Sequence, residues 1–132
     1  MGPARAGLSV GMAEKTVKIP GPDHPITVVK NPDRVVVKVG DRVVADTRDA
    51  LSLQEANYPA VQYIPRADVD FAQLERTDHQ TYCPYKGDAS YYTLLPDAEN
   101  AVWTYEQPYD AVADIREHVA FYPDKVSIEI IA

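Results

Sequence analysis

The first half of the chain alternates apolar and polar residues with a period of two. Segments 26–30 and 34–39 are rich in valine and isoleucine, and Val35, Val37 and Val39 fall at alternate positions. This is the period of a β-strand with one buried face. Gly40 and Asp41 then separate 34–39 from 42–46, which is the spacing of a two-residue hairpin. The pattern predicts a strand over 26–30, followed by a hairpin.

The same pattern continues along the rest of the chain. Further strands are predicted at 51–55, 61–64, 90–95 and 101–106, and a final hairpin is predicted to join 120–122 to 126–130. Pro59 and Pro65 flank the second of these strands. Because a proline has no N–H to donate to a neighbouring strand, we expect 61–64 to be a short edge strand.

Helical spacing is rare. One helix is predicted from Asp110, its N-cap, to His118, with Val112 and Ile115 on a buried stripe. Segment 68–75 has room for only one or two helical turns. The fold class predicted is therefore mainly β: an antiparallel β-tent or open barrel of about eight short strands, with one helix in the C-terminal half.

Length and charge narrow the classes of protein. A chain of 132 residues forms about one domain, which we place at residues 14–132 after a disordered leader at 1–13. The net charge of −7, without a cluster of Lys and Arg, argues against nucleic-acid binding. No run approaches the roughly 20 apolar residues of a membrane helix, so no membrane partner is expected.

The cysteine and histidine residues of the chain limit the disulfide bonds and metal sites that it could form. A single cysteine excludes an internal disulfide and a zinc site of paired cysteines, which favours a cytoplasmic location. The three histidines are scattered along the chain, and no paired Asp-x-Asp follows a Gly-Ser motif to hold magnesium for nucleotidyl transfer. We therefore expect no metal and no cofactor.

Aromatic residues are concentrated in one part of the chain. Residues 81–92 contain four of the nine tyrosines and the only cysteine, whereas residues 1–57 contain no Phe, Trp or Tyr. Tyr and Trp have an apolar ring with a polar edge, so a cluster of them suits the wall of a small-ligand pocket, although packing between strands would also explain them. The predicted ligand-binding residues are Tyr85, Lys86, Tyr91, Tyr92, Trp103 and Tyr105.

Three polar positions have both a chemical and a structural interpretation. Cys83 is a candidate nucleophile with His79 as its base, or else a small buried residue. Lys86 and Gly87 could bind an anion, or simply form a turn in which the glycine has a positive φ. Glu55 shares the apolar face of its strand, where it needs a partner such as Lys86, or would act as an acid or base with a raised pKa.

Several short motifs resemble those of the domain of unknown function 427 family. They are Leu53-x-Glu55, Tyr63-x-Pro65, Thr81-x-Cys-Pro-Tyr-Lys-Gly87, Ala89-x-Tyr91-Tyr92, Ala101-x-Trp103-x-Tyr105-x-x-Pro108 and Val119-Ala-Phe-Tyr122, and the match covers about residues 24–131. That family is similar to the β-tent folds, which include methionine sulfoxide reductase B and the thalidomide-binding domain of cereblon. The resemblance implies two antiparallel sheets meeting at an angle.

The resemblance also bears on the site. The Cys-x-x-Cys pairs that hold zinc in many of those relatives are missing here, and a lone Cys83 departs from the reductase chemistry. In the cereblon-like relatives an aromatic cage on one sheet receives a small polar ring. The resemblance implies that Tyr91, Tyr92, Trp103 and Tyr105 occupy such a place.

Two classes of function follow from these residues. The preferred one is a binding module that holds a small planar or cationic metabolite in an aromatic pocket, with Lys86 and Glu55 as polar anchors. The alternative is an enzyme that acts on a small or nucleotide-like substrate through Cys83 or Glu55. A homodimer formed along the valine-rich hairpin edge is a third possibility.

Overall fold

The computed structural model describes residues 15–132, so the leader expected at 1–13 lies outside the described residues. Within them the chain forms ten strands and three short 3-10 helices, η1 to η3. The strands are β2 (Ile26–Lys30), β3 (Arg34–Val39), β4 (Arg42–Thr47), β5 (Leu51–Glu55), β6 (Val61–Pro65), β7 (Leu74–Cys83), β8 (Gly87–Leu94), β9 (Ala98–Thr104), β10 (His118–Phe121) and β11 (Ser127–Ile131). The helices are η1 (Arg66–Asp68), η2 (Phe71–Gln73) and η3 (Asp110–Ile115).

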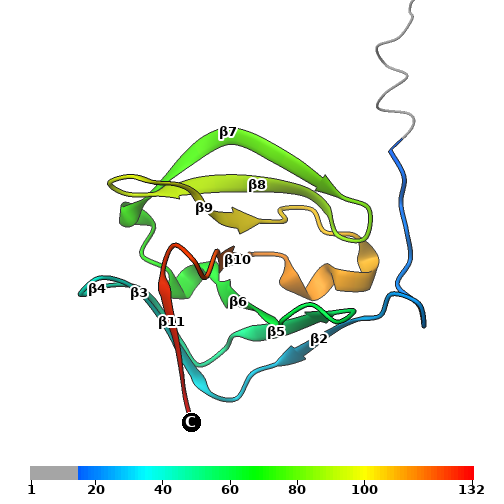
Figure 1. Cartoon of the computed structure of the whole chain (residues 1–132), viewed down its shortest axis with the longest axis horizontal. Coiled ribbons are helices and arrows are strands. Elements are labelled where there is room, and N and C mark those ends of the chain that lie inside the picture. The colour runs from blue at the N-terminus through cyan, green and yellow to red at the C-terminus, as the bar shows by residue number, and fades with distance from the viewer. Residues whose placement is uncertain (1–14) are drawn as a thin grey trace, which may run out of the picture.

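The strands form two sheets in which every pairing is antiparallel. The larger sheet has the order β2-β5-β6-β10-β9-β8-β7, and the smaller has the order β11-β3-β4. In Figure 1, β7, β8 and β9 form one half of the larger sheet and β5 and β2 the other, with β6 and β10 between them. The predicted mainly β, antiparallel fold class is confirmed, and the sheets do not close into a barrel.

The valine-rich hairpin forms as the alternation predicts. β3 pairs with β4, and Gly40 in the turn has a φ of +58°, a conformation that glycine adopts at little cost. Val35 and Val37 are fully buried, so the alternate valines do supply an apolar face. The predicted strand at 26–30 also forms, as β2 beside β5.

The prediction that 61–64 is an edge strand is wrong. β6 lies inside the larger sheet, where it pairs with β5 on one side and β10 on the other. Pro59 precedes the strand and Pro65 is its last residue, so neither interrupts the ladder within it. Prolines at the two ends of a strand therefore do not restrict it to an edge.

The predicted C-terminal hairpin is also wrong, because its two strands belong to different sheets. β10 pairs with β6 and β9, whereas β11 pairs with β3. The turn over 123–125 carries the chain from one sheet to the other. The local sequence is that of a hairpin, but the neighbours of each strand come from distant parts of the chain.

The expected helix at 110–118 is replaced by η3, which ends at Ile115. It is a 3-10 element with a kink at Val112, where φ is −127° and ψ is 27°, and the chain enters β10 at His118. Its apolar residues are buried as expected, but two short turns suffice to bury them. Similarly, 68–75 contains the last residue of η1 and all of η2, and β7, which the sequence pattern missed, starts at Leu74.

Two apolar clusters lie on opposite faces of the larger sheet. The inter-sheet cluster is made of side chains between the two sheets: Val35, Val37, Val44, Ala45, Ala50, Ile64, Val69, Tyr92, Leu94, Ala101, Val102, Val119 and Phe121. The tyrosine cluster lies on the other face and contains Leu53, Tyr63, Ala89, Tyr91, Tyr105, Val112, Ile115 and Ala120. The neighbours Tyr91 and Tyr92 belong to different clusters because successive side chains of a strand point to opposite faces.

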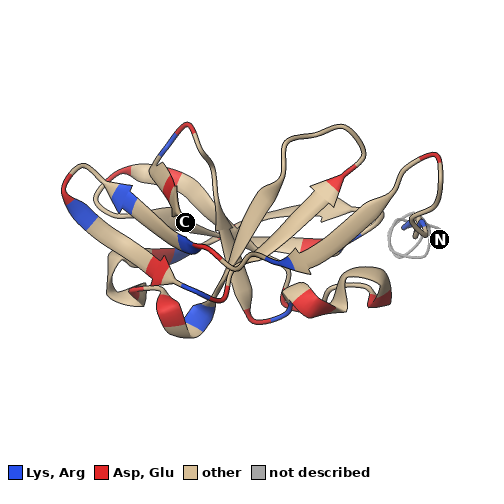
Figure 2. Cartoon of the chain, turned by 90° about the horizontal axis from the view of Figure 1, so that it is seen from below, with Lys and Arg blue, Asp and Glu red and all other residues tan. Residues whose placement is uncertain are grey.

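Charged residues are spread over the surface. In the view of Figure 2, Lys and Arg alternate with Asp and Glu and do not gather into a stripe. Several of them form exposed ion pairs, such as Arg34 with Asp46 and Arg76 with Glu106. Within residues 15–132, no helix has the length and apolar character needed to cross a membrane.

Candidate functional site

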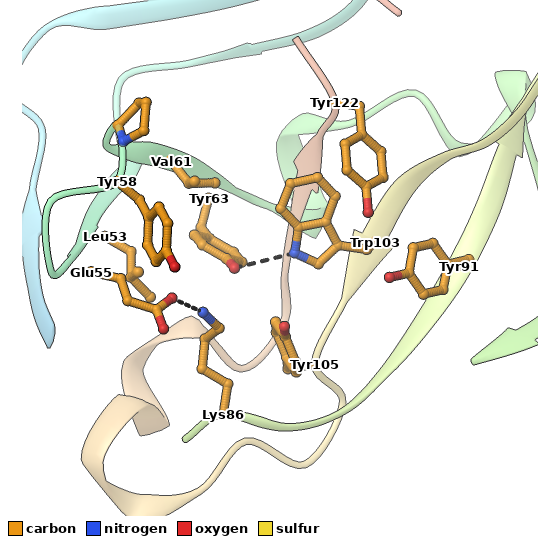
Figure 3. A pocket seen from close by; sticks show the side chains of 11 residues that line it. Leu53, Glu55, Tyr58, Val61, Tyr63, Lys86, Tyr91, Trp103, Tyr105 and Tyr122 are labelled. Atoms are coloured by element: carbon orange, nitrogen blue, oxygen red, sulfur yellow. Dashed lines mark hydrogen bonds and ion pairs between the residues drawn. The ribbon is translucent and has the colours of Figure 1, made fainter. Parts of the chain in front are cut away.

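A cavity of about 220 Å³ lies against the tyrosine cluster (Figure 3). Its walls come from the two halves of the larger sheet and from segments that follow the strands. The residues that line it are Leu53, Glu55, Tyr58, Pro59, Val61, Tyr63, Lys86, Tyr91, Trp103, Tyr105 and Tyr122.

The strand register explains how these residues meet. On one side, Leu53 of β5 stands opposite Val61 of β6. On the other, Tyr91 of β8 stands opposite Trp103 of β9. The two halves are joined where β10 pairs with β6 through two residue pairs only, so they face each other across a short junction. The cavity therefore lies between the two halves of the larger sheet, beside the junction of β6 and β10.

A tight turn between β7 and β8 directs Lys86 into this cavity. The backbone N–H of Lys86 donates to the carbonyl of Cys83, and Gly87 has a φ of +112°. A Cβ at Gly87 would lie 3.3 Å from the carbonyl oxygen of Gln107, so a side chain has little room there. The turn interpretation of Gly87 is therefore correct, and the same turn buries Lys86 to 8% exposure.

Lys86 and Glu55 form an ion pair at the wall of the cavity. The Lys86 Nζ donates to Oε1 of Glu55, and Nε2 of His24 donates to Oε2 at 2.8 Å. Both partners are largely shielded, with 10% of the lysine side chain and 17% of the glutamate side chain exposed. A charge removed from water in this way is tolerated only when it is paired.

The pKa of Glu55 is lowered from its ordinary value. Burial alone would raise it, but the hydrogen bonds from Lys86 and His24 outweigh burial. Of the two interpretations of Glu55, the pairing with Lys86 is confirmed and the raised pKa of the alternative is not found, so Glu55 is an ionised hydrogen-bond acceptor near neutral pH.

The aromatic side chains hold one another in place. The indole Nε1 of Trp103 donates to the hydroxyl of Tyr63 at 3.2 Å, and the two rings meet edge to face. The ring of Tyr122 lies 4.5 Å from that of Trp103, centroid to centroid. Burial raises the pKa of the Tyr63 and Tyr105 hydroxyls, so both stay protonated and neutral. The cavity thus has apolar ring faces and a few fixed polar atoms.

Most of the residues expected at the site do line this cavity, namely Glu55, Lys86, Tyr91, Trp103 and Tyr105. Two others lie elsewhere. Tyr85 stacks on His24 with the ring centroids 4.2 Å apart, outside the cavity. Tyr92 is on the opposite face of the sheet, where it packs against Phe71 and accepts a hydrogen bond from Arg66.

The candidate nucleophile Cys83 does not line the cavity. It is partly buried and packs against the tyrosine cluster. The ring of His79, its expected base, lies against that of Tyr91 at 4.6 Å. Among residues 15–132, no group of three or more His, Cys, Asp or Glu side chains is arranged to hold a metal ion.

Besides the apolar residues Leu53, Pro59 and Val61, sequence reasoning missed four aromatic or polar residues of the site. Tyr58, Tyr63 and Tyr122 line the cavity, and His24 holds Glu55 from behind. Tyr63 shares a strand face with Val61, which was a usable signal once that strand was placed inside the sheet. The others come from loops or strand ends, whose position depends on long-range packing.

Together, the fold and the cavity define an antiparallel β-domain with a small aromatic pocket that has an ion pair in its wall. Residues 27–132 match the family model described as Domain of unknown function (DUF427), and the chain belongs to this family. Among curated proteins, no sequence matches the chain.

Proposed function

We propose that the protein binds a small, neutral, planar ring that carries a carbonyl beside an N–H, as a cyclic amide does. The observation that carries this proposal is the shielded Lys86–Glu55 pair in the wall of an aromatic cavity. The rings supply contact area, and the ion pair supplies one donor and one acceptor next to each other.

Unused hydrogen-bonding capacity supports this ligand. An ammonium group has three N–H donors, and among the described residues Nζ of Lys86 has one acceptor, Glu55. A carboxylate has about four lone-pair positions, of which Lys86 and His24 use two. A ligand carbonyl would accept from Lys86 while the adjacent N–H donates to Glu55.

The charge balance favours a neutral ring over a cation. Lys86 and Glu55 neutralise each other, so a cationic ligand would meet the lysine ammonium and would have to displace it from its partner. The volume of about 220 Å³ is below the range of roughly 300–1,000 Å³ that is usual for ligand pockets. The pocket therefore suits a single ring better than a whole nucleotide.

An enzyme acting through Cys83 or Glu55 has less support. Cys83 lies outside the cavity, and the lowered pKa of Glu55 keeps it ionised, which is unfavourable for a general acid.

The protein contains a single tryptophan, so its indole N–H gives one NMR cross-peak that reports on the pocket. Titration of the ¹⁵N-labelled protein with 2-pyridone should move this Trp103 signal in a saturable way. N-methyl-2-pyridone, which lacks the N–H, should bind roughly ten- to a hundredfold more weakly, the value of one hydrogen bond to a charged group.

Two lysine variants test whether Lys86 holds the ligand. Lys86→Met should abolish the shift of the Trp103 signal, because it removes the donor to the carbonyl. Lys30→Met is the matched control, since Lys30 also forms an ion pair, with Asp49, but at the exposed surface. A Trp103 signal that 2-pyridone leaves unmoved at millimolar concentration, or equal binding of both pyridones, would contradict the proposal.

A further inference from the structure

A second cavity adjoins the pocket and differs from it in chemistry. It has a volume of about 480 Å³ and lies between β6 and β11. Its lining contains no charged residue: Tyr58, Pro59, Ala60, Val61, Gln62, Trp103, Phe121, Pro123, Ile128 and Ile130. We call it the apolar groove.

The pocket and the apolar groove share part of their walls. Tyr58, Pro59, Val61 and Trp103 line both. Figure 3 shows Trp103 and Tyr58 on opposite sides of Tyr63, with Val61 near them. Because Trp103 lines both cavities, its indole ring stands where the two spaces meet. A ligand whose ring lies beside Trp103 has the groove as its nearest apolar space.

Part of the wall of the groove is exposed apolar surface. Tyr58 is 63% exposed and Ile130 is 52% exposed, and both line the groove. Exposed apolar residues gathered in a hollow mark a binding surface more often than scattered ones do. The ion pair is confined to the pocket, so the two spaces together have one polar end and one apolar end.

We propose that the ligand is amphipathic: a cyclic amide ring held at Lys86 and Glu55, with an alkyl or similar apolar substituent that runs past Trp103 into the apolar groove. This inference rests on the proposed function, because the ring anchors the substituent. It goes further by naming the class of ligand and a second set of contact residues. The wall residues that the two cavities share favour this occupant over a separate protein segment.

A homologous series of ligands tests the inference. 2-Pyridone and 5-alkyl-2-pyridones with chains of one to six carbons would be titrated into the full-length protein, with the Trp103 indole signal and calorimetry as readouts. Burial of each methylene against the groove should lower the Kd roughly two- to fourfold, until the chain outgrows the groove.

Neighbouring residues of β11 provide matched variants. Ile130→Ser should flatten the dependence of Kd on chain length and leave the Kd of 2-pyridone itself unchanged. Ile131→Ser is the control, because Ile131 is also exposed, at 42%, but points away from the groove. Both positions are at the surface, so the variants should fold.

Three outcomes would overturn the inference. If the Kd stays constant along the series while 2-pyridone binds, the groove is not part of the site and only the proposed function survives. If 2-pyridone does not bind, both fail. If Ile130→Ser converts a dimer into a monomer in light scattering, a second copy of the chain occupies the groove.

Discussion

The two faces of the larger sheet are built from neighbouring residues of the same strands, yet one is packed mainly with aliphatic side chains and the other around tyrosines. On the inter-sheet face, valine, leucine and phenylalanine side chains of both sheets interdigitate. On the other face, tyrosines and Trp103 surround a cavity with an ion pair in its wall. The difference shows that aliphatic side chains pack against one another without polar partners, whereas rings with polar edges are positioned by the hydrogen bonds they must make.

The largest expected difference between the two faces is in leucine truncation. Leu94 and Leu53 are both almost fully buried, but Leu94 belongs to the inter-sheet cluster and Leu53 borders the cavity. Leu94→Ala should lower the free energy of unfolding by about 3–5 kcal/mol, because it creates a new void. Leu53→Ala should cost only about 2–3 kcal/mol, because it enlarges a space that already exists. Urea denaturation measures both, and a larger loss in Leu53→Ala would contradict the comparison.

The next largest effect concerns the ion pair. Lys86→Met leaves the Glu55 carboxylate shielded without its main partner and should lower the free energy of unfolding by about 2 kcal/mol. The double variant Lys86→Met with Glu55→Gln removes both charges and should recover part of this loss. Lys30→Met, at an exposed pair, should change stability by less than about 0.5 kcal/mol. Equal losses for the two lysine variants would show that the Lys86 pair is not shielded.

The lowered pKa of Glu55 gives a pH dependence with a definite sign. The folded state holds the carboxyl group in its ionised form more strongly than the unfolded chain does. Its contribution to stability is therefore present above the pKa of the unfolded chain, about 4.3, and is lost as the pH falls through the lower pKa of the folded state.

Asp46 and Glu106 also have lowered pKa values, so the measurement must isolate Glu55. The free energy of unfolding of the wild type minus that of Glu55→Gln should shrink as the pH falls from 6 to 3. A difference that grows over this range would mean that the folded state raises the pKa of Glu55.

The smallest effect concerns two adjacent tyrosines. The Tyr91 hydroxyl lies 2.8 Å from that of Thr81, and the Tyr92 hydroxyl accepts from Arg66 at 3.2 Å. Tyr91→Phe and Tyr92→Phe should each lower the free energy of unfolding by about 0.5–1.5 kcal/mol. Only Tyr91→Phe should also shift the Trp103 indole signal, because only Tyr91 shares the cavity. A shift in both would mean that the faces are not independent.

Local sequence patterns were enough to predict much of this architecture. The alternating valines and the Gly40-Asp41 turn predicted the β3–β4 hairpin, and the same period predicted β2 and β5. The mistakes came where long-range pairing decides. The position of β6 inside the sheet and the separation of β10 from β11 depend on strands that are far away in the sequence.

At the candidate site, too, local sequence patterns predicted some residues and long-range packing placed the others. The aromatic residues of 81–92 and 101–106 pointed to Tyr91, Trp103 and Tyr105, and the apolar face of its strand pointed to Glu55 as a residue in need of a partner such as Lys86. Because successive side chains of a strand point to opposite faces, Tyr91 and Tyr92 cannot both line one pocket, and the prediction is wrong for Tyr92. Tyr122 could not be found in this way, because it reaches the cavity from the end of β10.

A crystal structure of the protein soaked with 2-pyridone tests the central claim most directly. The account predicts electron density for the ring beside Trp103, with its carbonyl oxygen within hydrogen-bond distance of Nζ of Lys86 and its N–H directed at Glu55. An empty cavity at millimolar 2-pyridone, or one closed by the tyrosine rings, would contradict it.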